Sequence, residues 1–202
     1  MVVANECKDR FWDRKGQISL NIQAVVDCNM RFIDFVNRYP GSCHDARIFR
    51  SSSLYHRLEN NPLPGFLLAD SGYAVTSYML TPLRNPCLPA EVLYNKSQIL
   101  TRNLIERTFG CWKSKFWCLK GLRLKLSTSL NVITACAVIW NFLLDEKEKP
   151  NEEYWPDPYA EGATGASTFT HSSRADSERT RLIATHFTKE SERRERTCLP
   201  AN

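Results

Sequence analysis

The chain has 202 residues, a length that suits one domain with its own hydrophobic core, alone or followed by a tail. Its hydrophobic content of 43% is ordinary for a globular protein. The sequence contains no run of about 18 apolar residues, so it predicts no membrane-spanning helix. The first 15 residues, MVVANECKDRFWDRK, carry charges where a secretory signal has its apolar core. We therefore expect no signal peptide and no membrane partner.

The formal net charge of +5 is unevenly distributed. Residues 1–144 hold 18 Lys and Arg against 10 Asp and Glu, whereas residues 145–202 hold 9 against 12. A basic body favours an anionic partner such as nucleic acid, although charge that serves only solubility gives the same count.

Eight cysteines are present, and no two have the CxxC spacing. Because most of them lie in apolar or helical contexts, we interpret them as reduced thiols of an intracellular protein. A disulfide framework or a zinc site fits this spacing less well.

The first predicted elements are two strands. Apolar and polar residues alternate from residue 18, and a second apolar run spans 32–36, with a tight turn at 27–30 between them. Pro40 and Gly41 end the second strand. Ser42 is then expected to cap a helix over 43–50, with Asp45 as the acidic partner of a capping box. A second short helix is predicted over 53–59.

The stretch FLLAD, residues 66–70, is short and apolar, as in a buried strand. Residues 71–91 contain three prolines and predict an irregular connection. Helical periodicity then predicts a helix from 91 or 96 to 115, and another over 130–144. From 148 to the end the chain is rich in Pro, Gly, Ser, Thr and charge, so we expect that part to be mostly disordered.

Two carboxylates stand where they can do chemistry. Asp70 ends the apolar strand, and Glu106 lies in mid-helix between Arg102 and Arg107. A strand end and a following helix can bring two such acids together around a divalent cation, Mg²⁺ or Mn²⁺. Taken singly, an Asp before Ser-Gly is typical of a turn residue, and a Glu beside two Arg is typical of a solvated ion pair.

Five segments, in this order, carry a resemblance to the DDE endonuclease domain of PIF/Harbinger-type transposases and of the nucleases domesticated from them. They cover roughly residues 10–146 and read DRKGQISLNIQAVVD, YPGSCHDARIFRSSSLYHRLE, GFLLADSGYAVTSYMLTPLRNP, YNKSQILTRNLIERTFGCWKSKFWCL and ITACAVIWNFLLD.

The resemblance implies an α/β domain over residues 13–147, after a polar lead of residues 1–12. Its fold would be RNase H-like, a mixed sheet with flanking helices. Its activity would be hydrolysis of phosphodiester bonds in DNA, dependent on a divalent metal held by two Asp and one Glu. Asp70 in LLADSGY matches the second Asp, and Glu106 in IERTFG matches the Glu.

The chain departs from the family pattern at the first Asp. In the family this residue lies in an Asp-Gly-containing strand upstream of the segment that DRKG matches. Here twelve residues precede Asp13, and they include Asp9 but no Asp-Gly and no strand pattern. We therefore expect an N-terminally truncated domain with impaired catalysis. The alternatives are a catalytically inactive DNA- or protein-binding relative and a fragmentary gene model.

The segment SCHDARIF offers Asp45 and His44 as active-site neighbours, against plainer roles in helix capping and packing. Asp27 is interpreted as a hairpin-turn residue.

Candidate phosphate contacts are Arg102, Arg107, Lys113 and Lys115. The basic segment from Lys113 to Lys125 is interleaved with Trp112, Phe116 and Trp117, which suits a track for a DNA backbone. Packing of the aromatic residues in a core, with the lysines in water, explains the pattern equally well. In this family a separate DNA-binding partner protein often supplies sequence recognition, and the expected location is the nucleus, the cytoplasm or both.

Overall fold

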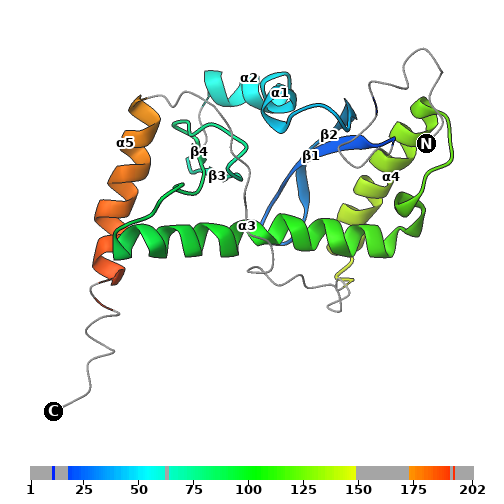
Figure 1. Cartoon of the computed structure of the whole chain (residues 1–202). Coiled ribbons are helices and arrows are strands. Elements are labelled where there is room, and N and C mark those ends of the chain that lie inside the picture. The colour runs from blue at the N-terminus through cyan, green and yellow to red at the C-terminus, as the bar shows by residue number, and fades with distance from the viewer. Residues whose placement is uncertain (1–10, 12–17, 62–63, 149–172, 192, 194–202) are drawn as a thin grey trace. The chain divides into compact units, whose positions relative to one another are not determined.

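The structure is a computed structural model of the chain, and it describes residues 11, 18–61, 64–148, 173–191 and 193. The chain divides into two compact units, one made of residues 1–56 and 104–157 and the other of residues 57–103 and 158–202. Each unit is described by itself. The described residues form a mixed α/β protein with several helices and two small sheets (Figure 1).

The first unit contains the predicted hairpin. Strand β1 (Leu20–Val26) pairs antiparallel with β2 (Phe32–Pro40), and the register shifts twice along the pair. Alternate residues of β1 pack on the hydrophobic core as the sequence pattern predicted, namely Leu20, Ile22, Ala24 and Val26. Among the described residues, β2 is the only strand that β1 pairs with.

The turn between the strands is held by Asp27, so its prediction as a turn residue is confirmed. Its Oδ1 accepts hydrogen bonds from the backbone N–H of Asn29 at 2.8 Å and of Arg31 at 3.0 Å. Met30 takes a φ of 65°, which is unfavourable for a residue with a long side chain. Such a conformation persists where the surroundings determine it, and here the Met30 side chain is buried in the core.

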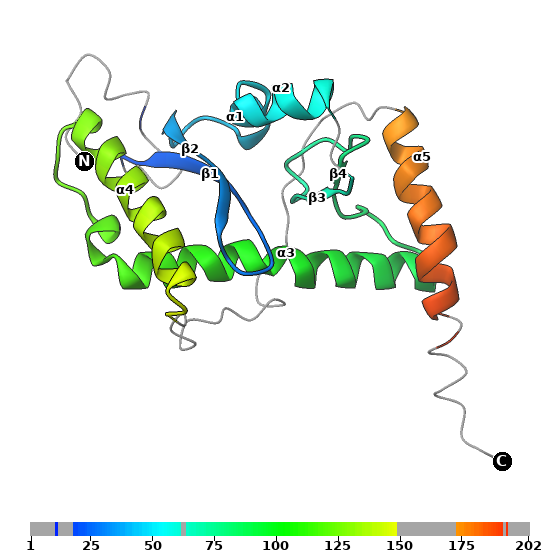
Figure 2. The ribbon, with the colours of Figure 1, turned by 180° about the vertical axis from the view of Figure 1, so that it is seen from behind.

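Trp112 is the centre of the core in the first unit. It is fully buried and packs edge-on against Phe32 and Phe35, with ring centroids 5.4 and 5.8 Å away. Trp112 comes from α3 (Pro89–Lys115), which contributes residues to both units. Helix α4 (Leu126–Asp145) adds Ile133, Cys136, Ala137 and Trp140 to the same cluster, at the spacing of one helical face. The hairpin and α4 lie side by side in both ribbon views (Figures 1 and 2).

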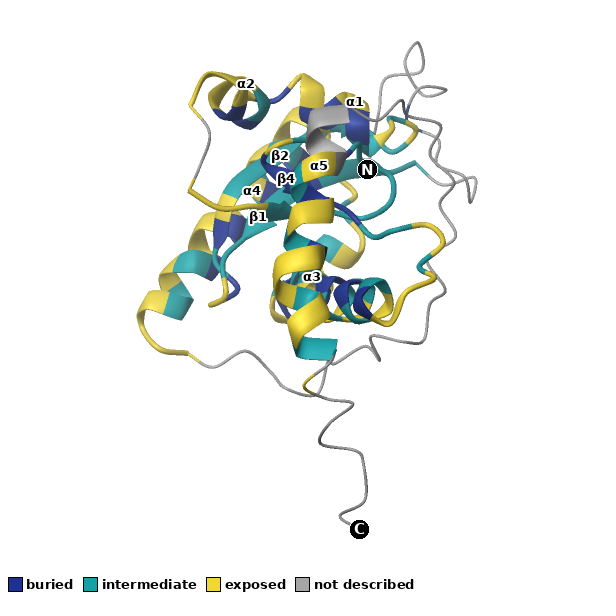
Figure 3. Cartoon of the chain, turned by 90° about the vertical axis from the view of Figure 1, so that its left-hand side faces the viewer, coloured by how far each residue is buried: buried dark blue, intermediate teal, exposed yellow. Residues whose placement is uncertain are grey.

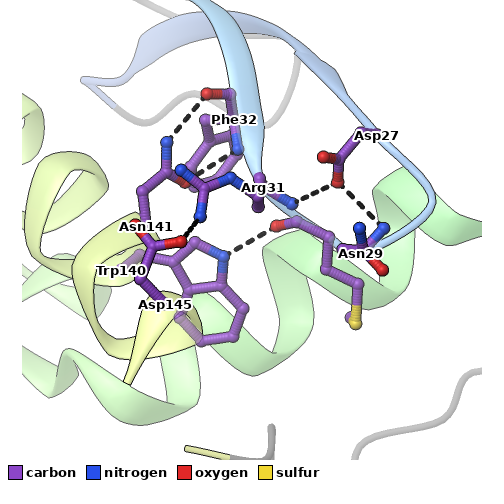
Figure 4. A network of polar contacts seen from close by, with 8 residues as sticks. Asp27, Asn29, Arg31, Phe32, Trp140, Asn141 and Asp145 are labelled. Carbon is purple, nitrogen blue, oxygen red and sulfur yellow. Dashed lines mark hydrogen bonds and ion pairs between the residues drawn. The ribbon is translucent and has the colours of Figure 1, made fainter. Parts of the chain in front are cut away.

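Two side chains of α4 fasten the start of β2. The indole Nε1 of Trp140 donates to the carbonyl of Met30 at 2.8 Å. The amide of Asn141 bonds both backbone groups of Phe32: its oxygen accepts from the N–H and its nitrogen donates to the carbonyl, each at 2.9 Å. Figure 4 shows these contacts together with the ion pair between Arg31 and Asp145.

Helix α1 (Asp45–Arg50) begins later than predicted. His44 is its N-cap, without a side-chain capping bond, so Ser42 as the cap and Asp45 as its capping-box partner were wrong. The carboxylate of Asp45 instead accepts a hydrogen bond from Asn21 of β1 at 2.7 Å. A tertiary partner therefore replaces the local one that the sequence suggested. Helix α2 (Ser53–Asn60) follows close to its predicted range.

In the second unit, β3 (Leu67–Leu68) pairs in parallel with β4 (Met79–Leu80). The predicted strand over 66–70 is thus only two residues long, and a short strand lies inside the stretch expected to be irregular. Side chains of α3 hold the chain that follows β4. The hydroxyl of Tyr94 donates to the carbonyl of Thr81 at 2.9 Å, and Asn95 bonds both backbone groups of Leu83.

Residues 148–202 were expected to be mostly disordered, yet the structure contains helix α5 (Ser173–Leu182) and a π-helical turn, Ile183–Phe187, in that range. Ile183 packs with Ala90 and Tyr94 in a small core of the second unit. Much of α5 carries exposed residues (Figure 3), which explains why its sequence has little apolar pattern. Residues 149–172 and 194–202 lie outside the described part, as does the polar lead of residues 1–12 apart from Phe11.

Helix α4 is long and apolar enough to cross a membrane by length and composition, and among the described residues it is the one helix of this kind. A core helix of a globular protein passes the same test. The face with Ile133, Ala137 and Trp140 is buried in the core of the first unit, whereas Val138, Ile139 and Phe142 are exposed.

We expect Asn141→Ala to lower the free energy of unfolding by about 1–3 kcal/mol relative to Asn131→Ala, because it leaves two backbone groups of Phe32 without their partner. Asn131 lies exposed on the same helix, so the two variants share the gain in helix propensity. Urea denaturation measures the difference. Equal stability of the two variants would show that the Asn141 bonds are not needed.

Burial raises the pKa of Tyr94 to about 12, against the opposing charge of Arg179. The unfolded chain ionises this phenol near pH 10, so the raised pKa contributes stability below that pH, and it is lost as the pH rises toward 12. Tyr94→Phe is expected to be less stable by about 1 kcal/mol at pH 8, where it lacks the bond to Thr81, and to lose less stability above pH 10. Urea titrations across that range check this, and a gap that stays constant with pH contradicts it.

Candidate active site

Asp70 lies two residues after β3 and is half-buried. The N–H of Ala69 donates to the carbonyl of Leu80 at 3.0 Å, which ties the residue before Asp70 to β4. The Asp70 Oδ1 accepts a hydrogen bond from the backbone N–H of Gly72 at 2.8 Å. This is the turn that Asp-Ser-Gly predicts. The turn uses one carboxylate oxygen of Asp70 and involves no bond to the other.

Gln98 of α3 fixes the residue that precedes Asp70. Its side chain is buried, and its Nε2 donates to the carbonyl of Ala69 at 2.8 Å. The residue before Asp70 thus has both its backbone groups bonded, one to Leu80 and one to Gln98. Gln98 Oε1 is buried with no hydrogen-bond partner among the described residues. Sequence reasoning missed Gln98, because no motif in the sequence marks this residue.

Glu106 lies in α3 and is exposed, with Arg102 and Arg107 half-buried on the same helix. Its exposure matches a residue that meets solvent or a ligand, and it matches a surface ion pair equally well. Asp70 and Arg102 belong to the second unit, whereas Glu106 and Arg107 belong to the first. Each acid is therefore characterised by its own surroundings.

The two candidate neighbours lie at the start of α1 in the first unit. His44 is exposed at the N-cap position. Asp45 is half-buried, and the same Asn21 amide that bonds its carboxylate also bonds the carbonyl of Cys43 at 2.9 Å. Asp45 thus joins β1 to α1, a structural role. A role for either residue at an active site stays a prediction.

The basic candidates Lys113 and Lys115 occupy the last turn of α3, and both are exposed. Lys113 lies 5.7 Å from the ring centroid of Phe109, and Lys115 is ion-paired with Glu148 at 2.5 Å. Of the interleaved aromatic residues, Trp112 is buried in the core and Phe116 packs against it, whereas Trp117 is 71% exposed. Core packing of the aromatic residues therefore holds for Trp112 and Phe116 and fails for Trp117.

The described residues contain no cluster of three or more His, Cys, Asp and Glu side chains that could hold a metal ion. The chemistry of Asp70 and Glu106 nevertheless suits a hard divalent cation, because carboxylate oxygens are the ligands that Mg²⁺ and Mn²⁺ prefer. The six described cysteines are free thiols, and burial raises the pKa of the Cys136 thiol to about 11. Such a thiol stays protonated near neutral pH and is therefore a weak nucleophile.

Comparison with known proteins places these residues in a family. The model of the DDE superfamily endonuclease matches residues 3–141, a range that includes both Asp70 and Glu106. The chain belongs to this family. The resemblance seen in the sequence is thereby confirmed.

Among the relatives is a protein of Mus musculus named "Putative nuclease HARBI1", 33% identical over 184 residues, which are 88% of this chain and 53% of the relative. The protein of the same name in Homo sapiens is 32% identical over 162 residues, 71% of this chain and 46% of the relative. "Protein ALP1-like" of Arabidopsis thaliana is 24% identical over 164 residues, 72% of this chain and 40% of the relative. The chain thus spans about half the length of the curated relatives it matches. No solved structure matches the chain significantly.

We expect Gly72→Ala to disturb the Asp70 carboxylate, because the added Cβ would lie 2.9 Å from its Oδ1. Loss of the turn bond should lower the free energy of unfolding by about 1 kcal/mol relative to Gly65→Ala, which meets nothing within 4 Å. Both variants reduce the entropy of the unfolded chain alike, so their difference isolates the contact. Urea denaturation measures it. A Gly72→Ala protein as stable as the Gly65→Ala protein would show that this bond contributes nothing.

Proposed function

We propose that this chain is the metal-dependent core of a DNA endonuclease with an RNase H-like arrangement, and that Asp70 and Glu106 are ligands of its divalent cation. The observation that carries the proposal is the position of Asp70. It lies two residues after a strand of a parallel pair, inside the segment that the family model matches, and its turn uses only one carboxylate oxygen. A second oxygen held at a strand end suits a cation ligand.

Mg²⁺ or Mn²⁺ bound there would supply a Lewis acid and lower the pKa of a coordinated water. The contributions of the chain itself are positional. Gln98 and Leu80 fix the backbone that precedes Asp70, so the side chain of Asp70 starts from a defined position. Glu106 is exposed on α3, where substrate can approach it.

The candidate phosphate contacts are Arg102, Arg107, Lys113 and Lys115, all on α3. Lys113 and Lys115 are exposed, so their charges are accessible to a DNA backbone, whereas Arg102 and Arg107 are half-buried. Arg presents a fork that can bind a phosphate through two hydrogen bonds, and Lys acts as a point charge. We further propose that a separate protein supplies recognition of the target sequence, and that the chain acts in the nucleus, the cytoplasm or both.

A second candidate function is DNA binding without cleavage. It is favoured by the segment 113–125, which contains five exposed basic residues and no acidic one, namely Lys113, Lys115, Lys120, Arg123 and Lys125. Such a surface binds a polyanion whether or not a metal site is complete.

The deciding experiment incubates the 202-residue chain with supercoiled plasmid DNA and Mn²⁺ or Mg²⁺. We expect only slow nicking, in line with the impaired catalysis that the sequence predicts. Asp70→Asn and Glu106→Gln should each reduce that rate further, by roughly 100-fold or more, because a cation lost from the site removes several kcal/mol of transition-state stabilisation. Glu146→Gln is the matched control, since Glu146 is an exposed acid just after α4. It should nick like the wild type.

Nicking that survives both substitutions would show that the site is assigned to the wrong residues. Salt-dependent retention of DNA without any nicking would instead select the second function.

A further inference from the structure

Trp117 is the most exposed of the large hydrophobic residues in the described part of the chain, at 71%. It opens a 3-10 helix, Trp117–Lys120, that directly follows the end of α3. A side chain of this size is usually buried over much of its surface, because the indole ring contributes a large apolar area. A single exposed hydrophobic residue is nevertheless common, so the backbone and the charges around Trp117 carry the argument.

The backbone around Trp117 is held firmly. The N–H of Phe116 donates to the carbonyl of Trp112 at 2.9 Å, and the N–H of Leu119 donates to the carbonyl of Phe116 at 2.9 Å. A 3-10 helix has three residues per turn, so side chains three apart share a face. Phe116 and Leu119 pack against the core, which directs Trp117 and Lys120 outward together. The exposure of Trp117 is thus a consequence of core packing on the opposite face.

Lys120 completes the surface beside the ring. Its Nζ lies 4.6 Å from the centroid of the Trp117 indole, within the range of a cation–π interaction. The ammonium group therefore stays next to an aromatic face and can still meet an anion. Lys113, Arg123 and Lys125 are exposed in the same segment, and Lys115 of that segment pairs with Glu148.

We propose that Trp117 and Lys120 form a binding site for an unpaired nucleotide of single-stranded DNA, with the base stacked on the indole and the phosphate near the ammonium. An aromatic ring beside a cationic side chain is the pair of groups that single-strand binding uses. In duplex DNA the base faces are covered by their neighbours, so the indole can stack only on an unstacked base. The site goes beyond the proposed nuclease function and needs neither a metal nor the candidate carboxylates.

The test measures binding by fluorescence anisotropy in EDTA. It compares a labelled single-stranded oligonucleotide of about 15 thymidines, a length typical of single-strand binding proteins, with a mixed-sequence duplex of the same length. Trp117→Ala should weaken single-strand binding by roughly 5- to 150-fold, the equivalent of one lost base stack. Duplex binding should change by less than about twofold, because phosphate contacts dominate there.

Three variants sharpen the result. Trp117→Phe keeps a stacking face and should recover most of the single-strand affinity. Lys120→Gln should weaken binding to both DNAs and reduce the slope of log K against log salt by about 1, whereas Trp117→Ala should leave that slope unchanged. Phe142→Ala removes another exposed aromatic residue, on α4 and outside the basic segment, and should bind like the wild type.

An unchanged single-strand affinity in Trp117→Ala would overturn the proposal, as would equal losses on both DNAs. A preference of the wild type for the matching RNA by more than about tenfold would overturn the assignment to DNA. A failure of the nicking experiment does not bear on these outcomes, since they are measured without metal.

Discussion

The structure of the first unit depends on how the hairpin β1–β2 is fastened to α4. A two-stranded hairpin alone is at best marginally stable in water, so its apolar face needs a cover. Trp140 and Asn141 meet this need at one point, bonding the backbone of Met30 and Phe32 just where β2 begins. The same contact maintains the unfavourable positive φ of Met30. The same helix, α4, therefore both covers the apolar face of the hairpin and fixes its turn.

This fastening determines what the core presents to solvent. With Phe32 held on α4, its ring meets Trp112, and the end of α3 must pack there too. The chain that leaves α3 then keeps Phe116 on the core and turns Trp117 outward. Apolar packing inside the first unit thus determines the basic, aromatic surface on its outside. In the segment 113–125, core packing describes Phe116, whereas a surface for DNA describes Trp117 and the lysines.

The sequence predicted elements where periodicity and turn chemistry agree. The alternation in β1, the turn at Asp27 and the long apolar pattern of α4 were all sufficient. It failed where a distant partner decides. Asp45 bonds Asn21 rather than a cap, and β3 shrinks to two residues because its pairing with β4 is short. Helix α5 is apolar at too few positions to show a period, so only its packing through Ile183 reveals it. The basic segment left the exposure of Trp117 open, because core packing explained the same pattern equally well.

The candidate site shows why structural and catalytic interpretations of one carboxylate need not exclude each other. Asp70 is a turn residue by its bond to Gly72, and that bond also limits how its side chain can rotate. A metal ligand benefits from such restriction, since less orientational freedom is lost on binding. Gln98 extends the restriction to the backbone, although its own buried Oε1 finds no partner among the described residues. An unbonded buried oxygen is unfavourable for folding. The bond from Gln98 to the Ala69 carbonyl offsets part of that cost, and it fixes the backbone just before Asp70.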